Sequence, residues 1–518
     1  MIIGGGITGA GIALDAATRG LRVGLIEKHD FAFGTSSRST KLIHGGLRYL
    51  KQLEFSLVRE VGSERAVVHR LAPHLVIPEK MLLPLSEGKS MGYWLTSIGL
   101  KIYDWLAGVV DEDKRRMLSR SETLKAEPLL KHSGIKGGAL YAEYRTDDAR
   151  LTTEILKTAV QHGAIVLNYV EAVAFLKADG KIHGVVVQDK LSDNVFDVGA
   201  TAVVNAAGPW VDQIRESDGS KHGSTLHLTK GIHIVVSREK LPLRQSVYFE
   251  VADGRMVFAI PRGNITYIGT TDTDYKGKQE DVSADRNDVE YLLQAVNENF
   301  NIQLLSFGDV LSSWAGLRPL IHEEGKSASA LSRKDEIFQS SSGLISIAGG
   351  KLTGYRKMAE RVVDMVIEKF FNDRIVGDCV SDRILLGHHF RDFADFAVFR
   401  SQVVLKTDQF LSTAHLQRLA DTYGPSAMDI INRARVSEWT EEILLREEID
   451  FAIRKEMVTG LNDFFIRRTG LMYFDPELMN RLLPAAKLIF QELLGWSEIE
   501  TARQVSAVME EWKRISIF

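Results

Sequence analysis

Near its start the chain reads Ile2-Ile3-Gly4-Gly5-Gly6-Ile7-Thr8-Gly9-Ala10-Gly11, an apolar strand end that runs into a glycine-rich turn. Gly4, Gly6 and Gly9 stand in GxGxxG register, and a segment with helical apolar periodicity follows. A second apolar strand, residues 23–26, ends at Glu27, eighteen residues after Gly9. Strand, helix, second strand and terminal acid together predict a βαβ unit that binds a dinucleotide.

The residues of this predicted unit have separate physical roles. Gly4 permits the tight turn, Gly6 lets the backbone approach a pyrophosphate, and Gly9 allows the helix to pack closely on the strand. The helix N-terminus offers free N–H groups to the phosphates, and the Glu27 carboxylate can accept hydrogen bonds from a ribose. An acid at this position disfavours NADP, but NAD and FAD fit the motif equally. We expect the same cofactor to contact the neighbouring residues Ile7, Thr8 and Lys28.

Length and composition limit the class of protein. The chain has 518 residues, which allows about three domains or one large enzyme. It is 45% hydrophobic and 25% charged with a formal net charge of −4, a balance that excludes a surface built as a whole to bind nucleic acid. The single cysteine, Cys379, rules out an intrachain disulfide, and no Cys/His cluster predicts a metal site. With neither an apolar run long enough to span a bilayer nor a signal-peptide pattern, we expect a cytoplasmic protein.

A hydroxyl-rich loop with basic residues follows the second strand, at residues 34–50. Such a loop can hydrogen-bond a phosphate and the polar edge of a ring, although its composition is equally typical of a solvated Ser/Thr turn. The residues of this loop that we expect to contact the cofactor are Thr35, Ser36, Ser37, Ser39, Lys41 and Leu42.

Two later segments are predicted to return to the nucleotide-binding part. Residues 203–207 form an apolar strand that runs into Gly208, and residues 343–348 form another that precedes two glycines and an amphipathic helix. That second helix would direct its positive end at the cofactor and stabilise negative charge at the pyrimidine end of a reduced flavin. NAD has no need of such stabilisation, so the arrangement favours FAD. We expect cofactor contacts from Gly208, Gly350, Lys351, Leu352 and Thr353.

The chain is predicted to have an α/β plus α organisation. A discontinuous Rossmann-like FAD-binding domain comprises residues 1–73, 147–214 and 343–372. Residues 74–146 and 215–342 alternate in the manner of antiparallel strands and would form a substrate-binding roof. Residues 373–518 are predicted to form a separate helical domain. The clusters Phe464-Phe465 and Met472-Tyr473-Phe474 in this domain are expected to be core rather than membrane anchors.

Several blocks in this order resemble the FAD-dependent, aerobic glycerol-3-phosphate dehydrogenase family. They are GGGITGAGIALDAATRGL, TSSRSTKLIHGGLRYL, TDDARL, NAAGPWVD, KGIHIVV, IGTTDTDYKG, GLRPL, GGKLTGYRKMAE and AIRKEMVTGLNDFFIRRTGL, and they extend from the start of the chain to Leu471. One departure is Gly354, where a second threonine is common in the family. The resemblance implies FAD as cofactor, a fold like that of D-amino-acid oxidase, and oxidation of sn-glycerol 3-phosphate to dihydroxyacetone phosphate with electrons passed to a quinone. Use of a quinone implies peripheral contact with the inner face of the cell membrane.

Such an oxidation requires a base for the hydroxyl proton and cationic donors for a phosphate dianion. His233 alone would more often be a satisfied sheet histidine, and Arg318 has a structural salt bridge as its alternative. The resemblance implies that both are catalytic: His233 as base or hydroxyl orienter, and Arg318 polarising the developing alkoxide or sharing the base role. Further substrate contacts are expected from Arg48, which would bind the phosphate, and from Tyr49, Thr270, Thr271, Arg333 and Lys351.

Three alternatives stay open at this point. A related oxidase would use oxygen as acceptor, and an amine or amino-acid oxidase would share the flavin fingerprint but need a carboxylate clamp instead of a phosphate pocket. A non-enzymatic or RNA-modifying flavoprotein is the third, although the balanced charge offers no basic stripe for RNA. The acceptor and the oligomeric state, for which a homodimer is one option, do not follow from the sequence.

Overall fold

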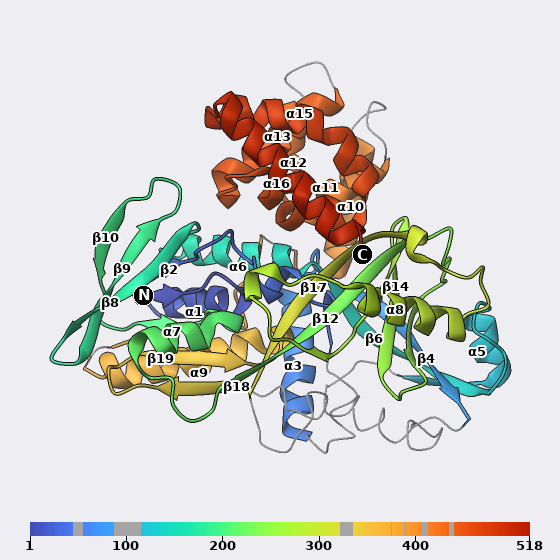
Figure 1. Cartoon of the computed structure of the whole chain (residues 1–518), viewed down its shortest axis with the longest axis horizontal. Helices are drawn as coiled ribbons and strands as arrows, with labels where there is room; N and C mark the ends of the chain where they lie inside the picture. Colours follow the sequence, from blue (N-terminus) through green and yellow to red (C-terminus); the bar gives the residue numbers. More distant parts are fainter. Residues whose placement is uncertain are drawn as a thin grey trace.

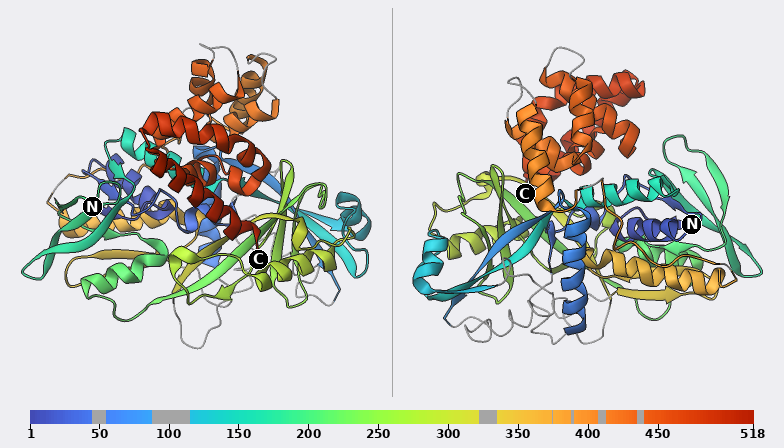
Figure 2. Two further views of the ribbon diagram at one scale, coloured as in Figure 1. Left: turned by 45° about the horizontal axis from the view of Figure 1, so that its top comes forward. Right: turned by 180° about the vertical axis from the view of Figure 1, so that it is seen from behind.

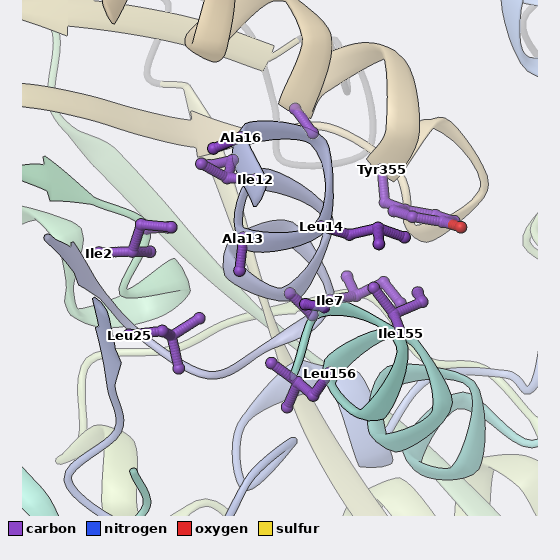
Figure 3. Close-up of a cluster of buried hydrophobic side chains, with 14 of the residues drawn as sticks. Ile2, Ile7, Ile12, Ala13, Leu14, Ala16, Leu25, Ile155, Leu156 and Tyr355 are labelled. Atoms are coloured by element: carbon purple, nitrogen blue, oxygen red, sulfur yellow. The ribbon is translucent and has the colours of Figure 1, made fainter. Parts of the chain in front are cut away.

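The computed structural model describes residues 1–44, 55–87, 115–321, 335–373, 375–387, 390–406, 413–434 and 440–518. Its N-terminal unit is the predicted βαβ motif: β1 (Ile2–Ile3), α1 (Ile7–Thr18) and β2 (Gly24–Ile26). β1 and β2 pair in parallel. Small and branched apolar residues of α1 let it pack tightly between the sheet and two neighbouring helices. Figure 3 shows this core, which contains Ile2, Ile7, Ile12, Ala13, Leu14, Ala16, Leu25, Ile155, Leu156 and Tyr355.

A six-stranded sheet grows outward from β1, in the order β18-β19-β11-β1-β2-β7. The added strands are β7 (Ile165–Leu167), β11 (Val204–Asn205), β18 (Asp335–Gln339) and β19 (Ile345–Gly349). All pairs are parallel except β18–β19. Strands from three separate stretches of sequence thus meet in one sheet, and β18 starts before residue 343, where the sequence pattern places the return of the chain. The helices that accompany this sheet are α6 (Asp148–Gln161), α7 (Val211–Asp218) and α9 (Tyr355–Phe370).

A larger mixed sheet lies beside the first one (Figure 1). Its order is β16-β12-β15-β14-β13-β4-β6-β3, with β17 paired to β12 and β5 paired to β6. The pairs are antiparallel except β13–β4, which is parallel. Its strands are β3 (Leu42–Ile43), β4 (Val76–Ser86), β5 (Arg116–Ser119), β6 (Ile135–Thr146), β12 (Leu226–Ser237), β13 (Ser246–Glu250), β14 (Met256–Arg262), β15 (Ile265–Gly269), β16 (Thr273–Asp274) and β17 (Val310–Ile321).

Shorter elements complete these two layers. A three-stranded antiparallel arm, drawn at the left of Figure 1, contains β8 (Val170–Ala178), β9 (Lys181–Asp189) and β10 (Val195–Gly199). The remaining helices of this part are α3 (Phe55–Leu71), α5 (Arg120–Ala126) and α8 (Arg286–Asn299). The 3-10 turns are η1 (Thr35–Ser37), η3 (Gly208–Trp210), η4 (Gln279–Asp281), η5 (Phe307–Asp309) and η7 (Leu352–Gly354).

The C-terminal helices form a separate bundle above the sheets, which the views of Figure 2 show from two sides. They are α10 (Phe393–Lys406), α11 (Thr413–Tyr423), α12 (Ser426–Ala434), α13 (Glu441–Glu456), the short π-helix η8 (Asp463–Arg468), α14 (Leu471–Phe474), α15 (Pro476–Leu494) and α16 (Glu498–Ser516). Within the described ranges, no helix is both long and apolar enough to cross a membrane.

Buried ion pairs join this bundle to the nucleotide-binding part. Asp30, four residues beyond the end of β2, accepts hydrogen bonds from Arg467 at 2.5 Å and from Arg468 at 2.8 Å. Arg150 of α6 makes two hydrogen bonds to the Glu456 carboxylate, at 2.6 and 2.8 Å. All five side chains are buried, so each charge depends on its partner for solvation.

Candidate active site

A cavity of about 630 Å³ lies between the six-stranded sheet and the large mixed sheet. Its lining comes from the glycine-rich turn, the end of β2, the start of β8 and strands of the mixed sheet. The predicted residues that line it are Gly4, Gly6, Ile7, Thr8, Glu27, Lys28, Thr35, Ser36, Ser39, Leu42, Gly208, His233, Thr270, Thr271, Arg318, Gly350, Lys351, Leu352 and Thr353. Residues far apart in the sequence therefore meet at one cavity.

The glycine-rich turn has the geometry of a phosphate cradle. Gly4 adopts a φ of +114°, a region that strongly favours glycine. A Cβ on Gly9 would lie 1.9 Å from the carbonyl oxygen of Gly4, so Gly9 acts through close packing and not through lining the cavity. The Ile7 N–H in the first turn of α1 donates to the Ser36 Oγ at 2.9 Å. These features fit the pyrophosphate of a dinucleotide at a helix N-terminus.

Glu27 is held at the end of β2 by the backbone. Its carboxylate accepts hydrogen bonds from the N–H of Gly5 at 2.7 Å and of His29 at 3.0 Å. Burial raises the pKa of this carboxyl, which the two backbone donors partly oppose. The side chain also lines the cavity, where it fits the predicted ribose contact. Lys28 beside it lines the same end but pairs its ammonium with Glu280 at 2.7 Å.

The described part of the hydroxyl-rich loop, residues 34–44, is hydrogen-bonded to β17. Thr35 Oγ1 donates to the Leu317 carbonyl at 2.6 Å, and the Ser39 carbonyl accepts from Trp314 Nε1 at 3.0 Å. The structure places Ser37 and Lys41 away from the cavity lining, in contrast to Thr35, Ser36, Ser39 and Leu42. Lys41 instead forms a buried ion pair with Asp148 at 2.5 Å and donates to the Ser37 carbonyl at 3.0 Å. The Asp148 carboxylate, at the start of α6, therefore neutralises the charge of Lys41.

The turn after β19 reaches the cavity from the opposite side. Lys351 Nζ donates to the His44 carbonyl at 3.5 Å, and Thr353 Oγ1 donates to the same carbonyl at 3.4 Å. These contacts connect the start of η7 to His44 in the hydroxyl-rich loop. The predicted approach of a second helix start to the cofactor thus has a structural counterpart in η7, which continues into α9.

His233 is buried on β12 with its imidazole in a tight setting. It stacks on the Trp314 indole with ring centroids 4.8 Å apart and an interplanar angle of 12°. Its Nε2 lies 3.1 Å from Thr40 Oγ1, while its Nδ1 has no hydrogen-bond partner among the described residues. Burial, followed by the charges of Arg318 and Lys41, holds the pKa of the imidazole well below its ordinary value. The ring is therefore neutral at physiological pH.

Contacts that include three hydrogen bonds hold Arg318 in place on β17, the neighbour of β12. It donates to the Thr271 carbonyl at 3.0 Å, to Asp272 Oδ1 at 3.0 Å and to Thr270 Oγ1 at 2.8 Å. The guanidinium lies over Gly231, where a Cβ would come within 2.2 Å of Nη2. Thr271 Oγ1 accepts from the N–H of Ile232 at 3.1 Å, which ties it to β12. Both threonines thus help to position β12 and Arg318 as well as lining the cavity.

Sequence reasoning missed several cavity residues, among them Thr40, Asp272, Arg255 and the stacked pair Tyr248 and Phe258. Asp272 stands directly after Thr271 in a quoted block, so its adjacency to a predicted residue was the available signal. The predicted substrate residues Arg48, Tyr49 and Arg333 lie outside the described residues.

The lining residues of the cavity match the parts of FAD. The cradle at α1, the ribose-type acid Glu27, the helix start at η7, His233 and Arg318 all line this one cavity. A dinucleotide with its redox ring beside these two side chains fits this arrangement. The residues that would hold it include Gly4, Gly6, Glu27, Ser39, Lys351 and Thr353.

Comparisons with known proteins agree with this fit. The family model "FAD dependent oxidoreductase" matches residues 1–356, and "C-terminal domain of alpha-glycerophosphate oxidase" matches residues 379–501. Aerobic glycerol-3-phosphate dehydrogenase of Bacillus subtilis is 48% identical over 509 residues, 96% of this chain and 91% of that protein. The protein of the same name from Staphylococcus aureus is 45% identical over 520 residues, 99% of this chain and 93% of that one.

Solved structures show the same fold. The glycerol-3-phosphate dehydrogenase from Bacillus halodurans, complexed with FAD, superposes with a TM-score of 0.85 at 43% identity and covers 100% of this chain and 95% of that chain. The predicted fold class, an FAD oxidoreductase fold like that of D-amino-acid oxidase with a C-terminal helical domain, is confirmed, as is FAD as cofactor. The chain belongs to the FAD-dependent glycerol-3-phosphate dehydrogenase family.

Proposed function

We propose that the protein oxidises sn-glycerol 3-phosphate to dihydroxyacetone phosphate. One observation carries the proposal: His233, buried and neutral, and Arg318, half-buried on the adjacent strand, both line the cofactor cavity. A secondary alcohol needs a proton acceptor and a cation near its oxygen, and these two side chains supply them. The names of the relatives support the choice of substrate.

The reaction removes a hydride and a proton from the substrate. Bound FAD supplies the acceptor for the hydride that leaves C2 of the substrate. His233 takes the hydroxyl proton, which its neutral ring can do because the depressed pKa leaves a lone pair free at physiological pH. Arg318 stabilises the negative charge that develops on the substrate oxygen, and its contacts with Thr270 and Asp272 hold the guanidinium in place for this.

The phosphate of the substrate requires further cationic donors. Arg48 is proposed as the main phosphate contact together with Tyr49, on the basis of the block TSSRSTKLIHGGLRYL in which both stand. Arg333 is proposed as a second phosphate contact. Lys351 adds a positive charge at the cavity from the opposite side. An amine or amino-acid oxidase would place its cations to bind a carboxylate instead. Recognition of the phosphate therefore distinguishes a glycerol-3-phosphate dehydrogenase from such an oxidase.

A quinone is proposed as the onward electron acceptor. The aerobic dehydrogenases that this chain is similar to support the choice of a dehydrogenase over an oxygen-using oxidase. A quinone dissolved in a bilayer would require contact with the inner face of the cell membrane through a peripheral surface. We propose that location for the working enzyme, with a homodimer as one option for its assembly.

The proposal is tested by anaerobic addition of glycerol 3-phosphate to the flavin-loaded protein, followed by the absorbance of oxidised flavin. We expect bleaching with glycerol 3-phosphate and none with sarcosine or glycine. Reoxidation by a short-chain quinone analogue should be much faster than reoxidation by oxygen. A fully loaded sample that glycerol 3-phosphate fails to bleach would reject the substrate.

Two variants test the roles of the reactive side chains. His233→Ala and Arg318→Ala should each slow bleaching by about 100-fold or more while flavin stays bound. His183→Ala is the matched control, because His183 is an exposed histidine on β9. Equal rates for His233→Ala and the control would remove His233 from the mechanism.

A further inference from the structure

An aromatic cluster lies directly behind His233, on the same face of the mixed sheet. Trp314 of β17 stacks on the imidazole, and Tyr267 of β15 lies 6.4 Å from it and 5.6 Å from Trp314 between ring centroids. Both aromatic residues are buried. A Cβ on Gly269 would lie 2.1 Å from Cδ2 of the imidazole, so backbone confines the ring on another side. The orientation of His233 therefore depends on where Trp314 lies.

The C-terminal helical domain supplies the other side of this cluster. The rings of Tyr473 and Phe474, in α14, lie 5.5 and 5.7 Å from the Trp314 ring. Ser312 Oγ of β17 donates to the Tyr473 carbonyl at 2.6 Å, which fixes α14 to the strand that carries Trp314. The predicted core character of this segment is confirmed for Met472 and Tyr473, which are buried. Trp314 is thus held between the histidine and the helical domain.

Lys41 closes the cluster from the nucleotide-binding side. Its ammonium lies 5.7 Å from the centre of the Trp314 ring and 5.6 Å from that of Phe474, and Asp148 of α6 neutralises it. Cations at such distances from aromatic faces are attracted to them. Phe474 therefore contacts both of the side chains, Trp314 and Lys41, that surround His233 from behind.

We propose that Phe474 is a positioning residue that acts through Trp314 to set the orientation and surroundings of the His233 imidazole. The C-terminal helical domain then completes the active site, although it lines none of the cavity that the described residues form. This inference rests on the proposed function, in which His233 takes the hydroxyl proton. It assigns the helical domain a role in catalysis that a purely architectural domain would not have.

The charges around His233 indicate how a loss of Phe474 would be seen. Arg318 from β17 and Lys41 from the hydroxyl-rich loop face the ring with positive charge, Asp148 of α6 offsets Lys41, and Tyr267 of β15 is uncharged at neutral pH. Burial is the largest cause of the low pKa. A smaller side chain at position 474 leaves space behind Trp314, lets the indole tilt and weakens that burial, so the pKa of His233 should rise toward its ordinary value.

The test compares Phe474→Leu with Phe490→Leu in the flavin-loaded full chain. Phe490 is a suitable control because it is a buried aromatic residue of the same domain whose ring packs on Trp496, at 5.3 Å between ring centroids, and not on Trp314. We expect Phe474→Leu to lower kcat for glycerol 3-phosphate by about 10-fold or more, with KM nearly unchanged, because a misplaced base costs rate and not binding. The acid limb of kcat/KM should move to higher pH. Phe490→Leu should lower thermal stability alone.

A second measurement does not depend on turnover. In protein labelled with 13C-histidine, the His233 resonance, assigned with His233→Asn, should titrate at a higher pH in Phe474→Leu than in wild type or in Phe490→Leu. Phe474→Tyr, which keeps the ring, should restore the wild-type titration and kcat. Identical His233 titrations in Phe474→Leu and Phe490→Leu would overturn the inference, even if glycerol 3-phosphate bleaches the wild-type flavin. A wild-type flavin that is not bleached would instead defeat the proposed function and leave the titration result standing as a test of positioning.

Discussion

At the scale of single residues, two glycines make room for the reactive side chains. Gly231 lies beneath the Arg318 guanidinium, and Gly269 lies beside the His233 imidazole, where a Cβ would come within 2.1 Å of Cδ2. Gly269→Ala should displace the imidazole and lower the rate of flavin reduction by about 100-fold, because the imidazole that we propose as the base would no longer meet the substrate hydroxyl. Flavin content should stay that of wild type. Stopped-flow absorbance under anaerobic conditions measures both quantities.

The control for this substitution is Gly199→Ala at the end of β10, where a Cβ would meet nothing within 4 Å. It should leave the rate of flavin reduction unchanged. A wild-type rate for Gly269→Ala would show that the imidazole has other room, and the geometry assigned to His233 would then be wrong.

These residues also show where sequence reasoning ends. His233 and Arg318 could be singled out because the blocks that contain them, KGIHIVV and GLRPL, resemble blocks of the dehydrogenase family. The need for Gly231 and Gly269 arises from side chains on neighbouring strands, so it appears only once the register of β12 with β15 and β17 is known. The sequence also could not predict that the Lys41 side chain points away from the cavity and toward Asp148. Asp148 is 107 residues away in the chain, and an irregular loop has no periodicity from which the direction of a side chain could be inferred.

At the scale of elements, the first turn of α1 depends on a side chain from η1. Gly6 precedes the helix and has no side chain to cap it, and the Ile7 N–H is instead satisfied by the Ser36 Oγ. Ser36→Ala leaves this buried donor without its acceptor, which should cost about 1–3 kcal/mol of local stability. Because the same turn has the geometry of a phosphate cradle, we expect the Kd for FAD to rise by about 10-fold. Flavin fluorescence during titration of the apoprotein measures that constant.

Ser506→Ala on the exposed surface of α16 provides the matched control, since its hydroxyl bonds only to the neighbouring Glu510 among the described residues. Flavin affinity in this variant should equal that of wild type. If Ser36→Ala also binds FAD like wild type, the cap does not contribute to the cradle.

The sequence predicted which segments form helices and strands better than it predicted how those elements are arranged in space. The GxGxxG spacing and Glu27 were sufficient for the β1-α1-β2 unit, because that motif encodes a local turn and its ligand. The parallel pairing of β13 with β4 and the antiparallel edge strand β18 did not follow from alternation, which reports the buried face of a strand and not its neighbours. Strand order is decided by contacts between segments that lie far apart in the chain.

At the scale of the whole molecule, buried charges hold the helical domain against the nucleotide-binding part. Glu456 receives two hydrogen bonds from Arg150 and lies 3.3 Å from Lys157, and its side chain is fully buried. Arg150 is the largest source of the positive charge that lowers the pKa of the Glu456 carboxyl to about 2 against the opposing effect of burial. Asp463 in η8 has the opposite shift, because burial and the neighbouring Asp30 raise its pKa. The junction therefore responds to acid chiefly through its paired carboxylates.

The sign of that response follows from the lowered pKa of Glu456. A carboxyl whose pKa is lower in the folded protein contributes stability above its ordinary pKa, and that contribution is lost as pH falls toward the folded value. The wild-type melting temperature should thus decline as pH falls from about 4.5 toward 2.

Glu456→Gln leaves Arg150 buried without its bidentate partner, so at pH 7 it should destabilise the protein by about 3–5 kcal/mol. Its melting temperature should then decline less than that of wild type over the same acid range. Glu492→Gln, which removes an exposed partner of Arg446, should change stability by less than about 1 kcal/mol. Scanning calorimetry of the three proteins across this pH range measures the effect, and equal acid slopes for wild type and Glu456→Gln would show that the junction does not depend on this carboxylate.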